Sequence, residues 1–302
     1  DDAVEYRVRA AKLAARRSGF AEAISHLDRA LVLLASQPKT EHRLRGELDV
    51  YRTQGGIYAE YRGFSSDACG QAYTAALDRC RELGDTPQIF AVLAGLGSYE
   101  ITRAGFDKCR ALAEECLARA RSQASKPPFI MGHLLLGGTL FLQGELAGAR
   151  RHLEEALQIH DADQVPRRTR QVLYVQDQKS TGLCYLALTL TIMGEADAGV
   201  AAAEASLAHS RALGGLHTIN YSLCYLASVL YIGGDYAGAL RYATESLGSA
   251  REQGFATWIG VSQVVRGASM VKLGQVDEGL AELARGVDAH AAMQAAAYQT
   301  FV

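Results

Sequence analysis

Two segments of this chain have nearly the same sequence. Residues 183–200 read LCYLALTLTIMGEADAGV, and residues 223–240 read LCYLASVLYIGGDYAGAL, so the second segment begins 40 positions after the first. In each segment an apolar stretch ends at a glycine, Gly194 or Gly234, and another small residue follows five positions later. Self-similarity at a fixed period of roughly 20–50 residues is the signature of a repeat architecture.

The same pattern recurs along the chain, with spacings of 45, 41, 40, 50, 40 and 40 residues. Its anchor residues are Ser18, Gly63, Ala104, Gly144, Gly194, Gly234 and Gly274. Small residues stand seven positions before the anchors, at Ala11, Gly56, Gly97, Gly137, Ala187, Ala227 and Gly267. Apolar residues, mostly large, stand thirteen positions after them, at Leu31, Ala76, Leu117, Leu157, Leu207, Leu247 and Val287. These two sets of residues were not used to define the anchors. Because each set nevertheless keeps one type of residue along the chain, the pattern indicates repeated copies of one structural unit.

Each copy contains two stretches of about 15–18 residues with apolar positions three and four apart, the spacing of an amphipathic helix. Small residues let the two helices of a hairpin approach closely. One hairpin cannot cover its own apolar face, so successive hairpins must stack. The five prolines, at positions 38, 87, 127, 128 and 166, fall between copies, where a helix has to stop. We therefore predict an all-α fold, a right-handed superhelix (solenoid) of about seven helical hairpins with a period near 40 residues.

This layout resembles the tetratricopeptide repeat (TPR). Leu136, Gly137 and Leu140, followed by Ala149 and Ala156, match a standard copy. The period near 40 exceeds the usual repeat of about 34 residues, which implies longer helices.

We predict one repeat domain over residues 1–302. Its expected units are 1–38, 40–85, 87–125, 127–160, 168–214, 216–254 and 256–293, with 294–302 beginning a further helix. The longest interval contains DADQVPRRTRQVLYVQD (161–177), which we interpret as a loop with an extended following helix. The chain begins at Asp1 without a methionine, and we expect it to be a fragment of a larger protein.

Composition excludes several classes of function. The 302 residues carry a formal net charge of −2, which argues against a strongly basic surface for nucleic acid or for a membrane. No apolar run of about 18 residues and no signal peptide occur. The six cysteines form no CxxC pair, so a reducing, cytoplasmic compartment is the natural interpretation.

No motif for catalysis or for a cofactor stands out. The chain lacks GxxxxGK[ST] and HExxH, and its eight histidines are dispersed. Gly95-Leu96-Gly97-Ser98-Tyr99 is superficially like a nucleophile elbow, but it lacks the final glycine and favours helix packing. We predict no catalytic residue, cofactor or metal in this chain, and therefore no enzyme activity of its own.

Three other clusters favour structural roles. Cys109 and Cys116 occupy small-residue positions of the repeat, which favours core packing over metal binding or redox chemistry. The paired glutamates at 114–115 and 154–155 are typical of solvated helix faces. The basic cluster at 167, 168 and 170 favours a solvated loop, with an anion or partner contact as the alternative.

The remaining candidate is a surface. In a superhelix of hairpins, the first helices line the concave side, and their non-packing positions are unusually apolar and aromatic here. The alternative is that tight winding or longer helices bury these residues. The candidate concave binding surface comprises Met131, Leu134, Phe141, Cys184, Leu188, Tyr221, Cys224 and Tyr231.

The second half resembles a more specific family. The resemblance covers roughly residues 130–295 and rests on four segments that occur in a familiar order. These are ARRHLEEALQIHDADQ (149–164), YVQD (174–177), SLAHSRALGGLH (206–217) and REQGFATWIGVSQVVRGASMVKLGQVDEGLAELARGVDAH (251–290). It is similar to the C-terminal TPR region of large bacterial signalling proteins, in which a class III adenylate/guanylate cyclase or a DNA-binding domain precedes a P-loop ATPase.

The resemblance implies a non-catalytic regulatory domain, the sensor or docking arm of a cytoplasmic signalling ATPase or nucleotide cyclase. Its partner would be a protein or peptide, including the other domains of its own parent chain. The alternatives are a sensor that binds a small-molecule inducer for a transcription regulator, and an autonomous scaffold. The sequence leaves open the partner, the kind of output domain and the oligomeric state.

Overall fold

The computed structural model describes residues 2–17, 19–84, 87–123, 126–162 and 177–292. Within these ranges the protein consists of helices without a strand, and the predicted all-α solenoid is confirmed. The helices are α1 (Asp2–Arg16), α2 (Phe20–Ala35), α3 (Glu41–Arg62), α4 (Asp67–Leu83), α5 (Ile89–Thr102), α6 (Phe106–Gln123), α7 (Lys126–Leu142), α8 (Leu146–Ala162), α10 (Gln178–Ile192), α11 (Ala196–Leu213), α12 (Leu216–Ile232), α13 (Tyr236–Gln253), α14 (Ala256–Lys272) and α15 (Val276–Ala291).

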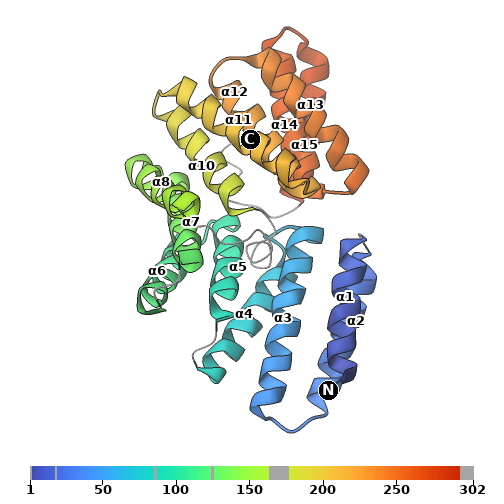
Figure 1. The fold of residues 1–302 in the computed structure, drawn as a ribbon. Helices are drawn as coiled ribbons and strands as arrows, with labels where there is room; N and C mark the ends of the chain where they lie inside the picture. Colours follow the sequence, from blue (N-terminus) through green and yellow to red (C-terminus); the bar gives the residue numbers. More distant parts are fainter. Residues whose placement is uncertain (1, 18, 85–86, 124–125, 163–176, 293–302) are drawn as a thin grey trace.

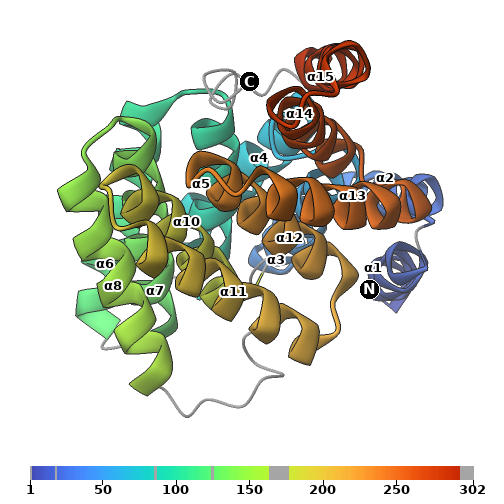
Figure 2. The same cartoon turned by 90° about the horizontal axis from the view of Figure 1, so that it is seen from above.

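The hairpins follow one another around a curved path, from α1/α2 to α14/α15 (Figures 1 and 2). The first helices form an inner row, in which α5 contacts α7, α7 contacts α10, α10 contacts α12, and α12 contacts α14. The path curves so strongly that α14 also contacts α3. A Cβ built on Gly63, at the end of α3, would lie 3.1 Å from the Thr257 Oγ1 of α14. We call this meeting of α3 and α14 the closure contact.

The turn inside each hairpin has a recurring geometry. The predicted anchors Gly144, Gly194, Gly234 and Gly274 have φ between +79° and +91°. The amide after each anchor donates to a carbonyl five residues back, as Asp235 N does to Leu230 O at 2.9 Å. This is the 6→1 bond of a Schellman cap, which needs a residue with positive φ. These four anchors, found by periodicity, are therefore the residues that end their first helices.

In most hairpins the small-residue column marks the contact between the two helices, whereas Gly97 of the third hairpin approaches Leu135 of α7 in the next one. A Cβ on Gly267 would lie 2.5 Å from Leu283 N and 2.7 Å from Gly279 O, so α14 and α15 touch backbone to backbone. The second hairpin departs from the predicted register. There Gly55, and not Gly56, makes the close approach, because its Cβ position lies 2.8 Å from the Tyr73 ring.

Helix length explains the irregular spacing near the N-terminus. Helix α3 has 22 residues, more than the stretches predicted for each copy, and this lengthens the first interval. The first hairpin and part of α3 form a core of their own, separate from the main core. The loop predicted over 161–177 is wrong at its described ends: α8 continues to Ala162, and Asp177 caps α10, which begins at Gln178 and at 15 residues is not extended. Residues 163–176, with the basic cluster, and the further helix at 294–302 lie outside the described residues.

The core of the last three hairpins contains buried hydroxyl and thiol groups in place of some apolar ones. Ser246 Oγ lies 2.8 Å from Ser262 Oγ and 3.1 Å from Cys224 Sγ, and it accepts a hydrogen bond from Asn220 Nδ2 at 3.2 Å. A similar set joins Ser206, Ser210 and Ser222 between α11 and α12. Each group satisfies a neighbour that burial would otherwise leave unpaired.

One prediction concerns the turn after α5, where Ala104 takes the glycine position with φ +60°. The left-handed conformation costs a non-glycine residue roughly 1–2 kcal/mol. Ala104→Gly removes this cost but makes the unfolded chain more flexible, so we expect a net gain of about 0.5–1 kcal/mol in the free energy of unfolding. The control Ala201→Gly, on the exposed face of α11, should lower that free energy by about 0.5–1 kcal/mol. Urea denaturation of both variants checks this, and a loss in Ala104→Gly would contradict it.

A second prediction concerns Ser246. Replacing it by alanine leaves Asn220 Nδ2 and Ser262 Oγ without their shared partner, so Ser246→Ala should lower the free energy of unfolding by about 1–3 kcal/mol. The matched control is Ser269→Ala, which is equally buried but donates to the Val265 carbonyl of its own helix. Denaturant unfolding measures both variants. If the free energy of unfolding falls equally in the two, the hydrogen bonds of Ser246 to Asn220 and Ser262 add no stability.

Candidate functional site

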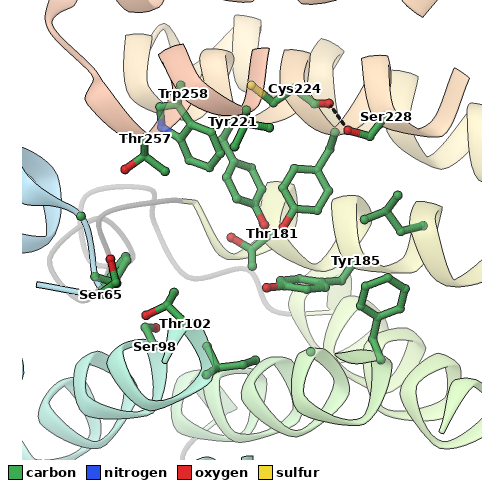
Figure 3. A pocket seen from close by; sticks show the side chains of 18 of the residues that line it. Ser65, Ser98, Thr102, Thr181, Tyr185, Tyr221, Cys224, Ser228, Thr257 and Trp258 are labelled. Carbon is green, nitrogen blue, oxygen red and sulfur yellow. Dashed lines mark hydrogen bonds between the residues drawn. The ribbon is translucent and has the colours of Figure 1, made fainter. Parts of the chain in front are cut away.

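A cavity of about 280 Å³ lies on the inner side of the superhelix. Its wall comes from α3, α5, α7, α10, α12 and α14, which are all first helices, and from the turn after α3. Figure 3 shows side chains of these helices converging on it, with Ser98 and Thr102 opposite Tyr221 and Trp258. Helix α12 contributes residues three and then four positions apart, at Tyr221, Cys224 and Ser228, because this stripe of the helix faces inward.

A continuous row of rings crosses the wall. Ring centroids are 5.9 Å apart for Phe141 and Tyr185, and 5.7 Å apart for Tyr185 and Tyr225. Tyr225 lies 4.5 Å from Tyr221, which lies 5.3 Å from Trp258 in an edge-to-face arrangement. These separations are those of favourable aromatic pairs. We call Phe141, Tyr185, Tyr225, Tyr221, Trp258 and His217 the aromatic row.

His217 ends the row and is held in its neutral form. Trp258 Nε1 donates to His217 Nε2 at 3.1 Å, and an indole N–H can only donate. Nε2 must therefore be unprotonated, which places the ring proton on Nδ1. Burial lowers the pKa of His217 to about 4, and its ring neighbours Phe255 and Trp258 carry no charge that would offset this. The imidazole is uncharged at neutral pH.

Charged side chains are missing from the cavity wall among the residues that the structure describes. The polar side-chain groups there are hydroxyls, the Cys224 thiol, the His217 ring and the Trp258 indole N–H, which donates to that ring. Several hydroxyls donate to carbonyls of their own helix, as Ser228 does to Cys224 O at 2.9 Å and Thr181 does to Asp177 O at 2.9 Å. The wall is therefore neutral and mainly apolar.

Six of the eight residues of the predicted concave surface line this one cavity: Leu134, Phe141, Leu188, Tyr221, Cys224 and Tyr231. The other two lie in the core instead. Met131 is fully buried between helices, and Cys184 packs against α11, with its Sγ 3.2 Å from Ser206 Oγ. Both positions turn toward neighbouring helices because the superhelix winds tightly.

Four residues of the wall, Tyr185, Tyr225, Trp258 and His217, are absent from the predicted surface. The sequence carries a signal for two of them, because Tyr185 and Tyr225 stand at the same place in LCYLA, next to the predicted Cys184 and Cys224. Trp258 and His217 have no counterpart in the other copies, so periodicity could not find them. The wall formed by Phe64 and Ser65 comes from a turn and lies outside the helical pattern.

The described residues offer little for catalysis. The six cysteines are buried and free, and burial raises their pKa values, for Cys109 to about 11 and for Cys116 to about 12. Cys109 and Cys116 are fully buried, as expected from the packing role predicted for these two. Gly95 lies inside α5 against the Tyr73 ring, so the elbow-like segment is a helix contact. Within the described ranges, no three metal-ligating side chains come together, and no helix has the length and apolarity to cross a bilayer.

No protein-family model matches the chain, and no curated protein matches its sequence. Among solved structures, it is similar to a Rap protein complexed with competence and sporulation factor, with 14% identity, 97% of this chain and 78% of that chain covered, and a TM-score of 0.67. It is also similar to NprR in complex with its cognate peptide NprX, with 13% identity, 99% and 84% covered, and a TM-score of 0.60.

A third similar structure is a Signal Transduction ATPase with Numerous Domains from Pyrococcus horikoshii, which carries a tetratricopeptide repeat sensor. The identity is 13% and the TM-score 0.53, over 94% of this chain and 41% of that chain. At these identities the likeness shows the fold, a TPR-like helical repeat.

The neutral state of His217 predicts a pH dependence of stability. Its pKa of about 4 in the folded protein lies below the usual value of about 6.5. Neutral His217 therefore stabilises the fold above pH 6.5, and this contribution of up to about 3 kcal/mol is lost as the pH falls from 6.5 toward 4. His217→Gln keeps an acceptor for Trp258 and does not titrate. Its free energy of unfolding should fall less between pH 7 and pH 4.5 than that of the wild type, and an equal fall would contradict a buried, neutral ring.

Proposed function

We propose that this chain is the regulatory repeat domain of a cytoplasmic signalling protein, a non-catalytic sensor whose central cavity holds the effector. The observation that carries the proposal is the composition of the wall, to which six first helices contribute, including α3 and α14. These two helices are distant in sequence and meet at the closure contact. An occupant of the cavity touches both, so its binding free energy favours one curvature of the superhelix over others.

The comparisons support a sensor role. Similar folds were solved with a factor or a peptide bound, in the Rap protein and in NprR. The Pyrococcus protein carries its repeats as the sensor of a signal-transduction ATPase, which agrees with the resemblance of residues 130–295 to repeats that follow such an ATPase. The regulated partner would then be a P-loop ATPase of the parent chain, coupled to a cyclase or a DNA-binding domain.

Thermal unfolding in the presence of candidate effectors tests the cavity as the binding site. A bound effector at 100 times its dissociation constant adds about 2.7 kcal/mol to the free energy of unfolding, which raises the melting temperature. Thr181→Trp places a large side chain in the middle of the cavity (Figure 3) and should abolish the shift. The control Thr244→Trp lies on an exposed face of α13 and should keep it. Equal shifts in both variants would place binding elsewhere.

The coding sequence that flanks this segment tests the link to an ATPase. An in-frame GxxxxGK[ST] upstream is expected, with or without the carboxylates of a cyclase domain before it. A start codon directly before Asp1 would leave an autonomous scaffold, to be pursued by identifying its binding partners.

A further inference from the structure

We propose that the cavity binds a small, uncharged, mainly apolar molecule and not an extended peptide. This inference rests on the proposed function, since it takes the cavity to be the effector site. Three properties of the wall carry it, as far as the structure describes the wall: it has no charged side chain, it has no side-chain amide that pairs with both the N–H and the C=O of a peptide, and it is small.

The charge of the wall decides the charge of the ligand. The described residues that line the cavity include no Asp, Glu, Lys or Arg, and the one imidazole among them accepts from Trp258 and is neutral. A charged ligand that leaves water must find an opposite charge or several strong hydrogen bonds, and otherwise its desolvation is not offset. A free peptide carries charge at both termini. The wall therefore favours a ligand without formal charge.

The hydrogen-bonding groups of the wall argue against a peptide backbone. Each peptide residue brings an N–H and a C=O that must be paired when buried. Asn and Gln, whose amides can pair with both, are missing from the described wall. The hydroxyls of Thr102, Thr181 and Ser228 already donate to carbonyls of their own helices, at 2.8 to 2.9 Å. These three can still accept, and the wall carries further hydroxyls, such as those of Ser98 and Tyr231, so it suits a ligand with a few polar groups better than a buried peptide backbone.

Size and shape agree with a compact ligand. The cavity of about 280 Å³ lies just below the roughly 300–1,000 Å³ typical of small-molecule sites. The aromatic row supplies ring faces and edges along one side, against which a cyclic or aromatic ligand can pack at favourable distances. Aliphatic side chains such as Leu188 and Val261 complete the wall.

A pair of fluorescent probes tests the charge requirement directly. N-phenyl-1-naphthylamine is neutral, and 1-anilinonaphthalene-8-sulfonate has the same ring system with one added sulfonate. We expect saturable binding of the neutral probe, at least tenfold tighter than that of the sulfonate. Similar affinities for the two probes would overturn the proposal.

Two matched variants locate the binding. Ser228 and Thr244 both donate to the carbonyl four residues back, but Ser228 lines the cavity and Thr244 is exposed on α13. Ser228→Asp should weaken the neutral probe at least tenfold, whereas Thr244→Asp should change its affinity less than twofold. Circular dichroism confirms that both variants are folded. An unchanged affinity in a folded Ser228→Asp would contradict the assignment.

Displacement of the neutral probe separates the kinds of effector. Uncharged cyclic and aromatic compounds should displace it, and extended peptides of five to eight residues should not. If peptides displace it and small molecules do not, the ligand class is wrong but the sensor function stands. If neither probe nor peptide binds the wild type, and no effector shifts its melting temperature, both the ligand class and the sensor function fail.

Discussion

The close approach of the two helices at one small residue, found in most hairpins, is the constraint on which the structure depends. At Gly137 a Cβ would lie 2.7 Å from Leu153 Cγ, and Ala187 and Ala227 are fully buried at the equivalent position. Because the second helix packs this tightly against the outer side of the first, the first helices are pressed together in an inner row. The side chains on their remaining face then point into the superhelix and form the cavity wall.

The distribution of charged side chains follows the same division between the outer second helices and the inner row of first helices. Ion pairs on the outer side link consecutive hairpins, as Arg110 pairs with Glu145 at 2.8 Å and Arg150 with Glu195 at 2.7 Å. Exposed pairs of this kind add less than about 1 kcal/mol each, but they occur at equivalent places and favour one register of stacking. The inner side carries rings and hydroxyls. The near-neutral composition thus combines a charged outer surface with a cavity whose described lining carries no charged side chain.

The fold could be predicted almost completely from the sequence, whereas the site could be predicted only in part. Turns and helix contacts are local, so they repeat with the sequence, and Gly194 and Gly234 identify them directly. The cavity depends on how small rotations between hairpins add up along the chain. Met131, Thr181 and Tyr221 are equivalent in the repeat, yet Met131 is buried in the core while the other two line the cavity. The sequence of a single repeat copy therefore does not tell whether the residue at this position lies in the core or lines the cavity.

The closure contact has a consequence for how the protein unfolds. In an open solenoid each repeat contacts only its neighbours, so the ends can fray while the middle stays folded. Here Gly63 and Thr257, which belong to the second and the seventh hairpin, lie against each other. Loss of structure at one end therefore removes support from the other, and the linear array gains some of the cooperativity of a globular domain.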